Sequence, residues 1–274
     1  MNLLAMKRSM EQIDNPLITV VTVVFNDVQH IEDTILSVVN QTYPNIEYII
    51  IDGGSTDGTV DIIKKYEERI AYWVSEPDKG IYDAMNKGIQ KATGEWINFM
   101  NAGDLFALNN TISSLFIGMD YQCDVLYGDT VHILTSGRYL HRAEPIYILE
   151  HRMPFCHQSC FVKANLLKNI GFNCKYRIAA DYDLFYRLYK QGYVFQQVSN
   201  TIAVFESIEG LSSVHPELLY REYSEINGKS FQILRIKVKV RNLLKRLMKI
   251  FPEGCQHRLS QGYKRIFTAY KKLD

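Results

Sequence analysis

The sequence predicts an α/β fold in which a mostly parallel sheet is flanked by helices, because strand-like and helix-like segments alternate along the first part of the chain. Three apolar, strand-like segments each run into polar side chains, and parallel strands bring their carboxyl ends to one edge of a sheet. These segments are 17–25, 46–51 and 96–100, and the polar residues that follow them are Asn26, Asp52 and Asp104. We therefore expect a ligand site at that edge of the sheet.

The composition indicates a globular protein of 274 residues, 47% of them hydrophobic, with enough chain for one large domain or two small ones. Five cysteines form an odd set without a Cys-x-x-Cys pair. Their number and spacing indicate neither a disulfide framework nor a zinc site, and a reducing compartment is expected. Residues 1–8 place their charges after a very short apolar run, which is the wrong order and length for a secretory signal peptide, and no apolar run approaches the ~18 residues of a membrane span.

The expected elements follow from hydrophobic periodicity and turn residues taken in chain order. β-Branched residues favour the strands, and helices with one apolar face connect them as right-handed crossovers. In the first half, strands are expected at 17–25, 46–51, 71–75 and 96–100, and helices at 29–40, 59–69, 81–92 and 109–118. In the second half, we expect a strand at 123–127, a hairpin of 131–134 with 138–141, a strand opening at 157–159 and a helix beginning near 179.

The turn after the fourth strand carries two oxygen-bearing side chains, Asn101 and Asp104, around a gap left by small residues. Mg²⁺ or Mn²⁺ prefers such ligands and keeps positions free for substrate phosphates. The alternative is a local turn in which Asp104 caps the helix expected at 109–118. The glycine fingerprints of NAD-binding and phosphate-loop proteins are absent, so a metal at Asp104 is the candidate means of neutralising phosphates.

Several motifs in the first half resemble family 2 glycosyltransferases with the GT-A fold. They are TVVTVVFN at 19–26, EDTILSVVNQT at 32–42, DGGSTDGT at 52–59, EPDKGIYDAMNKG at 76–88 and ATGE at 92–95. The last two are similar to a bacterial branch that makes extracellular, O-antigen or colanic-acid-type polysaccharides. The resemblance covers residues 16–210 and implies a GT-A-type, Rossmann-like sheet.

The resemblance implies that the first half binds a nucleotide-sugar donor, with a UDP-sugar as the expected class. By this resemblance, Phe25 and Asn26 line the base pocket. Asp52 is expected to accept a hydrogen bond from the base, with Asp57 nearby.

The same resemblance implies contacts to the rest of the donor. Lys79 and Asn86 are expected to reach its phosphate or sugar; the alternative is a solvated lysine and an asparagine on a helix face. In the family the fourth strand ends in an Asp-x-Asp or Asp-Asp metal motif. Here Asn101 takes the first acidic position, so Asp104 and Asn101 are the expected ligands of Mg²⁺ or Mn²⁺.

The segment AADYDLFYRL at 179–188 is similar to the family's Glu-Asp-x-Asp-Leu segment, whose first aspartate is the catalytic base. Ala180 takes the glutamate position, so the resemblance assigns the base to Asp181, with Asp183 as a second candidate. Such a base takes the proton of an acceptor hydroxyl that attacks the opposite face of the sugar, which inverts the anomeric carbon. The alternatives are a helix N-cap for Asp181 and a helix-dipole role for Asp183. His157 either contacts the donor or metal, or is a packed or surface residue.

A basic tail follows the expected catalytic domain. Residues 229–274 contain thirteen Lys or Arg and two acidic residues, so the rest of the chain is acidic. Within 233–251, apolar residues and cations fall on opposite sides of a helical wheel, which predicts an amphipathic helix on an anionic membrane surface. The alternatives are packing on the acidic body or in a homodimer. Nucleic-acid binding is not expected, because no aromatic and basic platform is evident.

These features predict a leader at 1–15, a GT-A domain at 16–228 with a nucleotide-sugar half (16–104) and an acceptor half (105–228), and a basic amphipathic helical tail at 229–274. The expected function is metal-dependent, inverting sugar transfer to a saccharide or lipid-linked saccharide in bacterial surface polysaccharide synthesis. Its expected location is cytoplasmic, on the inner face of the cytoplasmic membrane. The alternative is a catalytically silent nucleotide-binding or scaffolding subunit of a polysaccharide assembly complex, which the residues at 101 and 180 favour.

Overall fold

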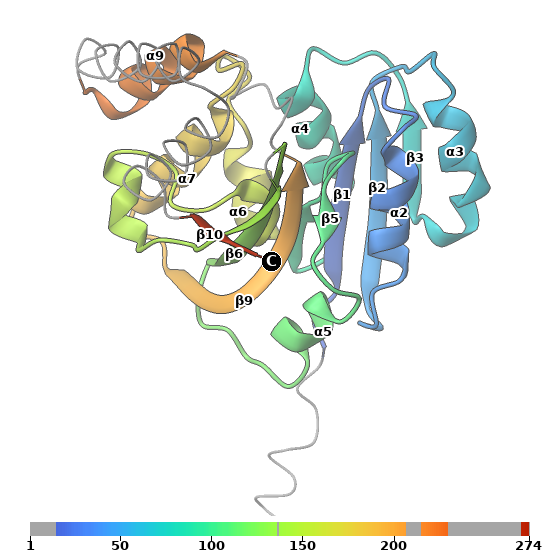
Figure 1. Ribbon diagram of the computed structural model, residues 1–274, viewed down its shortest axis with the longest axis horizontal. Helices are drawn as coiled ribbons and strands as arrows, with labels where there is room; N and C mark the ends of the chain where they lie inside the picture. The colour runs from blue at the N-terminus through green and yellow to red at the C-terminus, as the bar shows by residue number, and fades with distance from the viewer. Residues whose placement is uncertain (1–14, 136, 207–214, 230–269, 274) are drawn as a thin grey trace, which may run out of the picture.

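A computed structural model of the 274-residue chain describes residues 15–135, 137–206, 215–229 and 270–273 (Figure 1). In this part of the chain, ten strands form one sheet. The main path through it runs in the order β10-β7-β6-β8-β4-β1-β2-β3, and β9 and β5 join it at the side. The sheet divides into a parallel part and a largely antiparallel part, which Figure 1 shows side by side.

The parallel part is made by the first four strands, whose order is β4-β1-β2-β3. Their bounds are β1 (Ile18–Val24), β2 (Ile46–Asp52), β3 (Tyr72–Ser75) and β4 (Trp96–Phe99). Because β1 and β2 pair in parallel register as far as Val24 and Asp52, their carboxyl ends lie at the same edge. The predicted parallel arrangement is therefore confirmed.

The other part begins where β8 pairs antiparallel with β4, and β6 then pairs antiparallel with β8 and β7. The strand β9 runs parallel to β6 and curves strongly around this part of the molecule (Figure 1). The bounds are β5 (Leu105–Phe106), β6 (Val125–Leu134), β7 (Gly137–His141), β8 (Cys160–Lys163), β9 (Phe195–Glu206) and β10 (Tyr270–Lys272). The hairpin predicted around Gly137 is confirmed by the pairing of Leu134 with Gly137.

Helices cover both faces of the parallel part, which explains why its strands are apolar on both sides. On β1, Val20 belongs to the same buried cluster as Ile35 of α2 (Ile31–Val39), whereas Val21 belongs to the cluster that contains Met85 of α4 (Ile81–Lys91). A Cβ atom on Gly88 would lie 2.4 Å from Val21, so only glycine lets α4 approach the strand so closely. Each such buried aliphatic side chain contributes about 1.5–3 kcal/mol to folding.

The remaining helices and 3-10 turns include the elements that carry Asp181 and His157. Their bounds are α3 (Thr59–Lys65), α5 (Thr111–Phe116), α6 (Ala164–Ile170), α7 (Ala180–Lys190) and α9 (Pro216–Asn227), with 3-10 turns η1 (Glu67–Arg69), η2 (Ile146–Glu150) and η3 (His157–Ser159). In Figure 1, α7 and α9 lie on the side of the antiparallel strands, away from α2 and α3. None of the helices described has the length and apolar character that a membrane span requires.

The structure differs from the sequence prediction in three places. The strands expected at 123–127 and 131–134 are one strand, β6, because β9 pairs with it along most of its length. The residues 157–159 form η3 and precede β8 instead of opening it. Residues 270–272, which were predicted to belong to a helical tail, form the strand β10 on β7. The helix predicted at 233–251 lies outside the described residues.

Candidate functional site

A cavity of about 860 Å³ opens at the carboxyl ends of β1 and β4 and extends to the start of α7. Five of the sequence-predicted site residues line it: Phe25, Asn26, Asn101, Asp104 and Asp181. The other five are not among its lining residues: Asp52, Asp57, Lys79, Asn86 and Asp183. The fold therefore brings the expected metal ligands and the first candidate base to one cavity.

Asn101 and Asp104 occupy a tight turn after β4. The backbone N–H of Asp104 donates to the carbonyl of Asn101 at 2.9 Å, and Gly103 between them has a φ of 89°. The Thr34 hydroxyl accepts from the Gly103 N–H and donates to the Asp104 carbonyl, both at 3.0 Å. The side chain of Asp104 accepts a hydrogen bond from Gln158, so it does not cap α5.

The electrostatics of this turn suit a cation. Burial raises the pKa of the Asp104 carboxyl to about 7, although His157 and the hydrogen bond from Gln158 act in the opposite direction. The amide Oδ1 of Asn101 is buried and has no hydrogen-bond partner among the described residues. A buried, unpaired carbonyl oxygen is unfavourable unless a ligand satisfies it. Because carboxylate and amide oxygens are hard ligands, these two residues fit Mg²⁺ or Mn²⁺.

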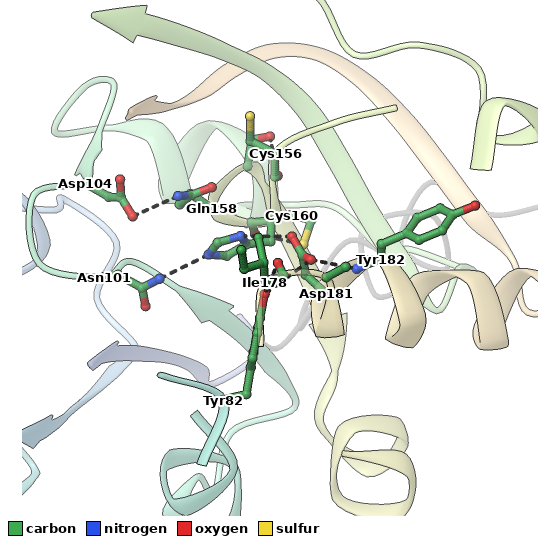
Figure 2. A network of polar contacts seen from close by, with 12 residues as sticks. Tyr82, Asn101, Asp104, Cys156, Gln158, Cys160, Ile178, Asp181 and Tyr182 are labelled. Atoms are coloured by element: carbon green, nitrogen blue, oxygen red, sulfur yellow. Dashed lines mark hydrogen bonds and ion pairs between the residues drawn. The ribbon is translucent and has the colours of Figure 1, made fainter. Parts of the chain in front are cut away.

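His157 connects this turn to α7. Its Nε2 atom lies 3.1 Å from Nδ2 of Asn101, which can only donate, so Nε2 is the acceptor. A neutral imidazole then carries its proton on Nδ1, which lies 3.6 Å from Oδ2 of Asp181. These two contacts place the imidazole between Asn101 and Asp181, and Figure 2 shows the side chain of the next residue, Gln158, directed at Asp104. His157 therefore contacts both sides of the cavity, and its expected contact with the donor or the metal stays a prediction.

Asp181 lies in the first turn of α7 and is partly exposed to the cavity. Its Oδ1 accepts from the Tyr182 N–H at 2.7 Å. The hydroxyl of Tyr82, on α4, lies 3.4 Å from the same oxygen and donates to the Ile178 carbonyl at 2.7 Å. The helix itself begins after Ala179 without a side-chain cap, so capping is not the role of this carboxylate.

Glu222, on α9, holds the backbone that leads into α7. Its side chain is buried, and its two oxygens accept the N–H groups of Arg177, Ile178 and Ala179 at 2.9–3.0 Å. A carboxylate at the amino end of a helix also interacts favourably with the helix dipole. Glu222 therefore fixes the approach to Asp181, a role that sequence reasoning missed because the two segments are more than forty residues apart.

Asp183 points elsewhere. It is buried, and its Oδ2 accepts from Nε of Arg187 at 2.8 Å, one helical turn further along α7. Burial raises the pKa of Asp183, and the neighbouring guanidinium works against that shift. Arg187 also donates to the Gly171 carbonyl, so the pair ties α7 to the end of α6.

The residues that were expected to bind the nucleotide base mostly form hydrogen bonds with the loop that follows β2. Asp52 is fully buried, and both of its oxygens are occupied: Oδ2 accepts from the Gly54 and Ser55 N–H groups and the Ser75 hydroxyl, and Oδ1 accepts from the Ser55 hydroxyl. Asn26 has a φ of 50°, and its Oδ1 accepts from the Thr56 N–H at 2.9 Å.

Asp57 and Phe25 are the other two residues that were expected near the nucleotide base. Asp57 accepts from Thr59 and from the Val28 N–H, and the hydrogen bonds of Thr59 chiefly lower its pKa. Phe25 is 62% exposed at the edge of the cavity, where its ring is free to stack on a ligand. Asp52 and Asp57 therefore shape the loop, and Phe25 and Asn26 face the cavity.

Asn86 and Lys79 lie away from the cavity lining. Both ends of the Asn86 amide are used, since Oδ1 accepts from the Phe172 N–H and Nδ2 donates to the Phe172 carbonyl. Lys79 is exposed, and its backbone N–H donates to Asp83. The 76–88 motif thus supplies Tyr82 to the site and otherwise packs α4 against its neighbours.

Comparison with known proteins gives four findings. The model of the family described as glycosyl transferase family 2 matches residues 19–193. The chain is 32% identical over 194 residues to the PGL/p-HBAD biosynthesis glycosyltransferase of Mycobacterium bovis, covering 68% of this chain and 75% of that protein. The fold is similar to S. aureus TarS 1–349 in complex with UDP (TM-score 0.62, 20% identity, 77% of this chain and 64% of that one). It is also similar to the mannosyltransferase PcManGT from Pyrobaculum calidifontis in complex with GDP-Man and Mn²⁺ (TM-score 0.61, 19% identity, 83% and 71%).

Proposed function

The chain belongs to glycosyl transferase family 2, and from this premise we propose that it is a metal-dependent, inverting glycosyltransferase. Its donor in this proposal is a nucleoside-diphosphate sugar of the UDP class. Its acceptor is a saccharide or lipid-linked saccharide in bacterial surface polysaccharide synthesis. The complexes of TarS with UDP and of PcManGT with GDP-Man and Mn²⁺ support a donor of this class on this fold.

One observation carries the proposal: the oxygens of Asn101 and Asp104 and the carboxylate of Asp181 open into the same cavity. Asn101 and Asp104 suit the charged diphosphate end of a donor, and Asp181 suits proton removal from an acceptor. A single imidazole, that of His157, contacts both groups. Asn101 has a buried amide oxygen without a partner among the described residues, and the neighbouring carboxyl of Asp104 has a raised pKa. Both features cost stability, so a ligand explains them better than a purely structural role does.

Asn101 and Asp104 would hold the divalent cation in this proposal, and the cation would stabilise the negative charge that develops on the leaving diphosphate. Gln158 keeps the Asp104 carboxylate turned toward the cavity by donating to Oδ2 at 2.9 Å. Phe25 and Asn26 line the end of the cavity that follows β1, where the nucleotide base would lie.

Asp181 would accept the proton of the attacking acceptor hydroxyl. Its Oδ1 is engaged by the Tyr182 N–H, whereas Oδ2 faces the more distant Nδ1 of His157. Attack by the acceptor from the side opposite the diphosphate forms the new glycosidic bond as the old bond to phosphate breaks. The proton moves from the acceptor oxygen to the carboxylate, so one displacement suffices and the configuration inverts.

A lipid-linked acceptor lies at a membrane, and the basic residues of 229–274 support docking there. Thirteen cations against two acidic residues in this segment would attract anionic headgroups, at about 1 kcal/mol for each cation near the surface. The remainder of the chain is acidic and would otherwise be repelled. We therefore propose a peripheral location on the inner face of the cytoplasmic membrane.

Thermal unfolding with a panel of UDP-, GDP- and dTDP-sugars, with and without Mn²⁺, tests the donor proposal. A donor at 100 times its Kd stabilises the folded chain by about 2.7 kcal/mol, which shifts the melting temperature measurably. We expect stabilisation by one nucleotide class and only in the presence of Mn²⁺.

Slow release of the nucleoside diphosphate in the same samples then separates an enzyme from a silent subunit. A transferase hydrolyses its donor slowly in the absence of acceptor, and a nucleotide-binding scaffold does not. Stabilisation without release, under all metal conditions, would support the scaffold, and no stabilisation by any donor would contradict both.

A further inference from the structure

Three metal-ligating side chains meet outside the Asn101 and Asp104 turn: His132, His141 and Cys156. One ligand atom from each lies within 4.8 Å of the other two. The Sγ of Cys156 is 3.2 Å from Nε2 of His132, and the two imidazole rings pack edge to face with centroids 5.2 Å apart. In a tetrahedral site with Zn–N near about 2.0 Å and Zn–S near about 2.3 Å, an N···S pair is about 3.5 Å apart. Small side-chain movements would therefore bring the three atoms around one ion.

The fold makes this cluster from the two strands of one hairpin and the segment that precedes η3. His132 is on β6 and pairs with Tyr139, whereas His141 on β7 pairs with Thr130. Because side chains alternate along a strand, residues diagonal to one another in this register share a face of the hairpin. Cys156 reaches the same face from the segment just before η3.

The surroundings favour ligation by neutral rings. Burial lowers the pKa of both imidazoles, to about 3 for His132, so each ring is neutral at pH 7. A neutral ring has a lone pair on one nitrogen, as a metal ligand needs. Burial raises the pKa of the Cys156 thiol to about 12, so the sulfur binds a cation only after it releases its proton.

We propose that His132, His141 and Cys156 bind a borderline-soft divalent cation, with Zn²⁺ as the best fit, at a second metal site. Two imidazole nitrogens and one thiolate are ligands that Zn²⁺ accepts and that Mg²⁺ and Mn²⁺ do not prefer. Both His132 and Cys156 line the cavity, so the fourth position of a tetrahedral ion would face it and be open to water or a substrate oxygen. Binding releases one proton, from the thiol to solvent.

Such an ion would join the β6–β7 hairpin to the segment that carries His157, the residue after Cys156. Occupancy would therefore hold that segment in place from the acceptor side of the cavity. This site is distinct from the oxygen site in ligand type, and substitutions can separate the two.

Titration of the chelator-treated full chain with Co²⁺ tests the proposal, because Co²⁺ takes the place of Zn²⁺ and its bond to a thiolate absorbs in the near ultraviolet. We expect one equivalent of Co²⁺ to give that charge-transfer band together with visible bands of a tetrahedral ion. Addition of Zn²⁺ should abolish both. Cys156→Ser should lose the charge-transfer band, and His141→Gln should weaken Co²⁺ binding at least tenfold.

Two controls make the outcome decisive. Cys174→Ser removes an exposed thiol away from the cluster and should leave the band unchanged, which excludes adventitious thiol binding. Asp104→Ala removes a ligand of the oxygen site and should also leave it unchanged. The absence of a thiolate band in the wild-type chain, or its persistence in Cys156→Ser, would overturn the proposal and leave the Cys156–His132 contact as a hydrogen bond. Circular dichroism of each variant confirms that a lost band does not reflect unfolding.

Discussion

The Nδ1 atom of His157 lies 3.6 Å from Oδ2 of Asp181, while Nε2 of the same ring accepts a hydrogen bond from Asn101. One side chain therefore touches the proposed base and a proposed metal ligand. The ring is mostly buried, with 18% of its side chain exposed, so it is held in this position by packing as well as by polar contacts. This relationship predicts that His157 couples the two halves of the cavity.

Replacement of His157 by glutamine should lower sugar transfer by about 10- to 100-fold, the usual effect of losing a group that orients a metal ligand. Glutamine keeps polar contact to one side but cannot reach both. The apparent affinity for Mn²⁺ should weaken together with kcat, which initial rates at varied Mn²⁺ can measure. The control is His151→Gln, a substitution of an exposed histidine that does not line the cavity, and it should have no effect. Equal activity of the two variants would contradict the assignment.

Replacement of Glu222 by glutamine should destabilise the start of α7. The variant retains one acceptor oxygen for three N–H groups, and an unsatisfied buried donor costs about 1–3 kcal/mol. Urea unfolding should show a loss of that size, and kcat should fall more than KM changes because Asp181 is less firmly placed. Glu225→Gln, on the exposed side of the same helix, should change neither quantity.

Replacement of Asp104 by alanine should abolish metal-dependent donor binding without unfolding the protein. Burial disfavours the anion, which raises the pKa of Asp104, and relief of that cost should offset much of the lost hydrogen bond from Gln158, so the variant should remain folded. Calorimetric titration of donor with and without Mn²⁺ measures the effect, with Asp120→Ala on the exposed loop after α5 as the control. An unchanged dependence on Mn²⁺ would show that the metal binds elsewhere.

Reversal of three tail charges, Arg241→Glu, Lys245→Glu and Lys249→Glu, should release the protein from anionic membranes. Each cation near such a surface contributes about 1 kcal/mol to membrane binding, so reversal of three charges should weaken binding strongly. Added salt should also weaken the binding of the wild-type chain. Sedimentation with anionic liposomes measures it. The same reversal at Lys64, Lys65 and Lys168 of the body is the matched control and should leave sedimentation intact. Identical behaviour of the two triple variants would refute docking through the tail.

The parallel part of the fold was predictable because its signals are local. Val20 and Val21 are both apolar although they face opposite sides of β1, which is typical of a strand covered by helices on both faces. The rule that parallel strands share a carboxyl edge predicts a ligand site beside Asn26, Asp52 and Asp104, and Asn26 and Asp104 do line the cavity, whereas Asp52 does not. Such local reasoning failed at β6, which was expected as two strands at 123–127 and 131–134. Pairing with β9 continues past the turn residues between them and makes them one strand.

The partners of each site residue were less predictable, because they come from distant segments. The sequence around Asp52 does not show that the Ser75 hydroxyl, from the end of β3, donates to its Oδ2 atom. The Asp183–Arg187 pair has the i, i+4 spacing of a helix, but the bond from Arg187 to the Gly171 carbonyl joins α7 to another segment and is not shown by that spacing. Only the fold separates Asp181, which faces the cavity, from Asp183, which ties α7 to α6.

The most direct test of the proposed function is the rate of sugar transfer by Asp181→Asn compared with Asp183→Asn, measured beside donor affinity. Asparagine keeps the shape of the side chain and removes its ability to accept a proton, so Asp181→Asn should reduce transfer by about 100-fold or more with an unchanged donor Kd. Asp183→Asn should lose stability through its contact with Arg187 and retain most of its transfer rate per folded molecule. Near-normal transfer by Asp181→Asn, with Asp183→Asn inactive though folded, would contradict the assignment of Asp181 as the base.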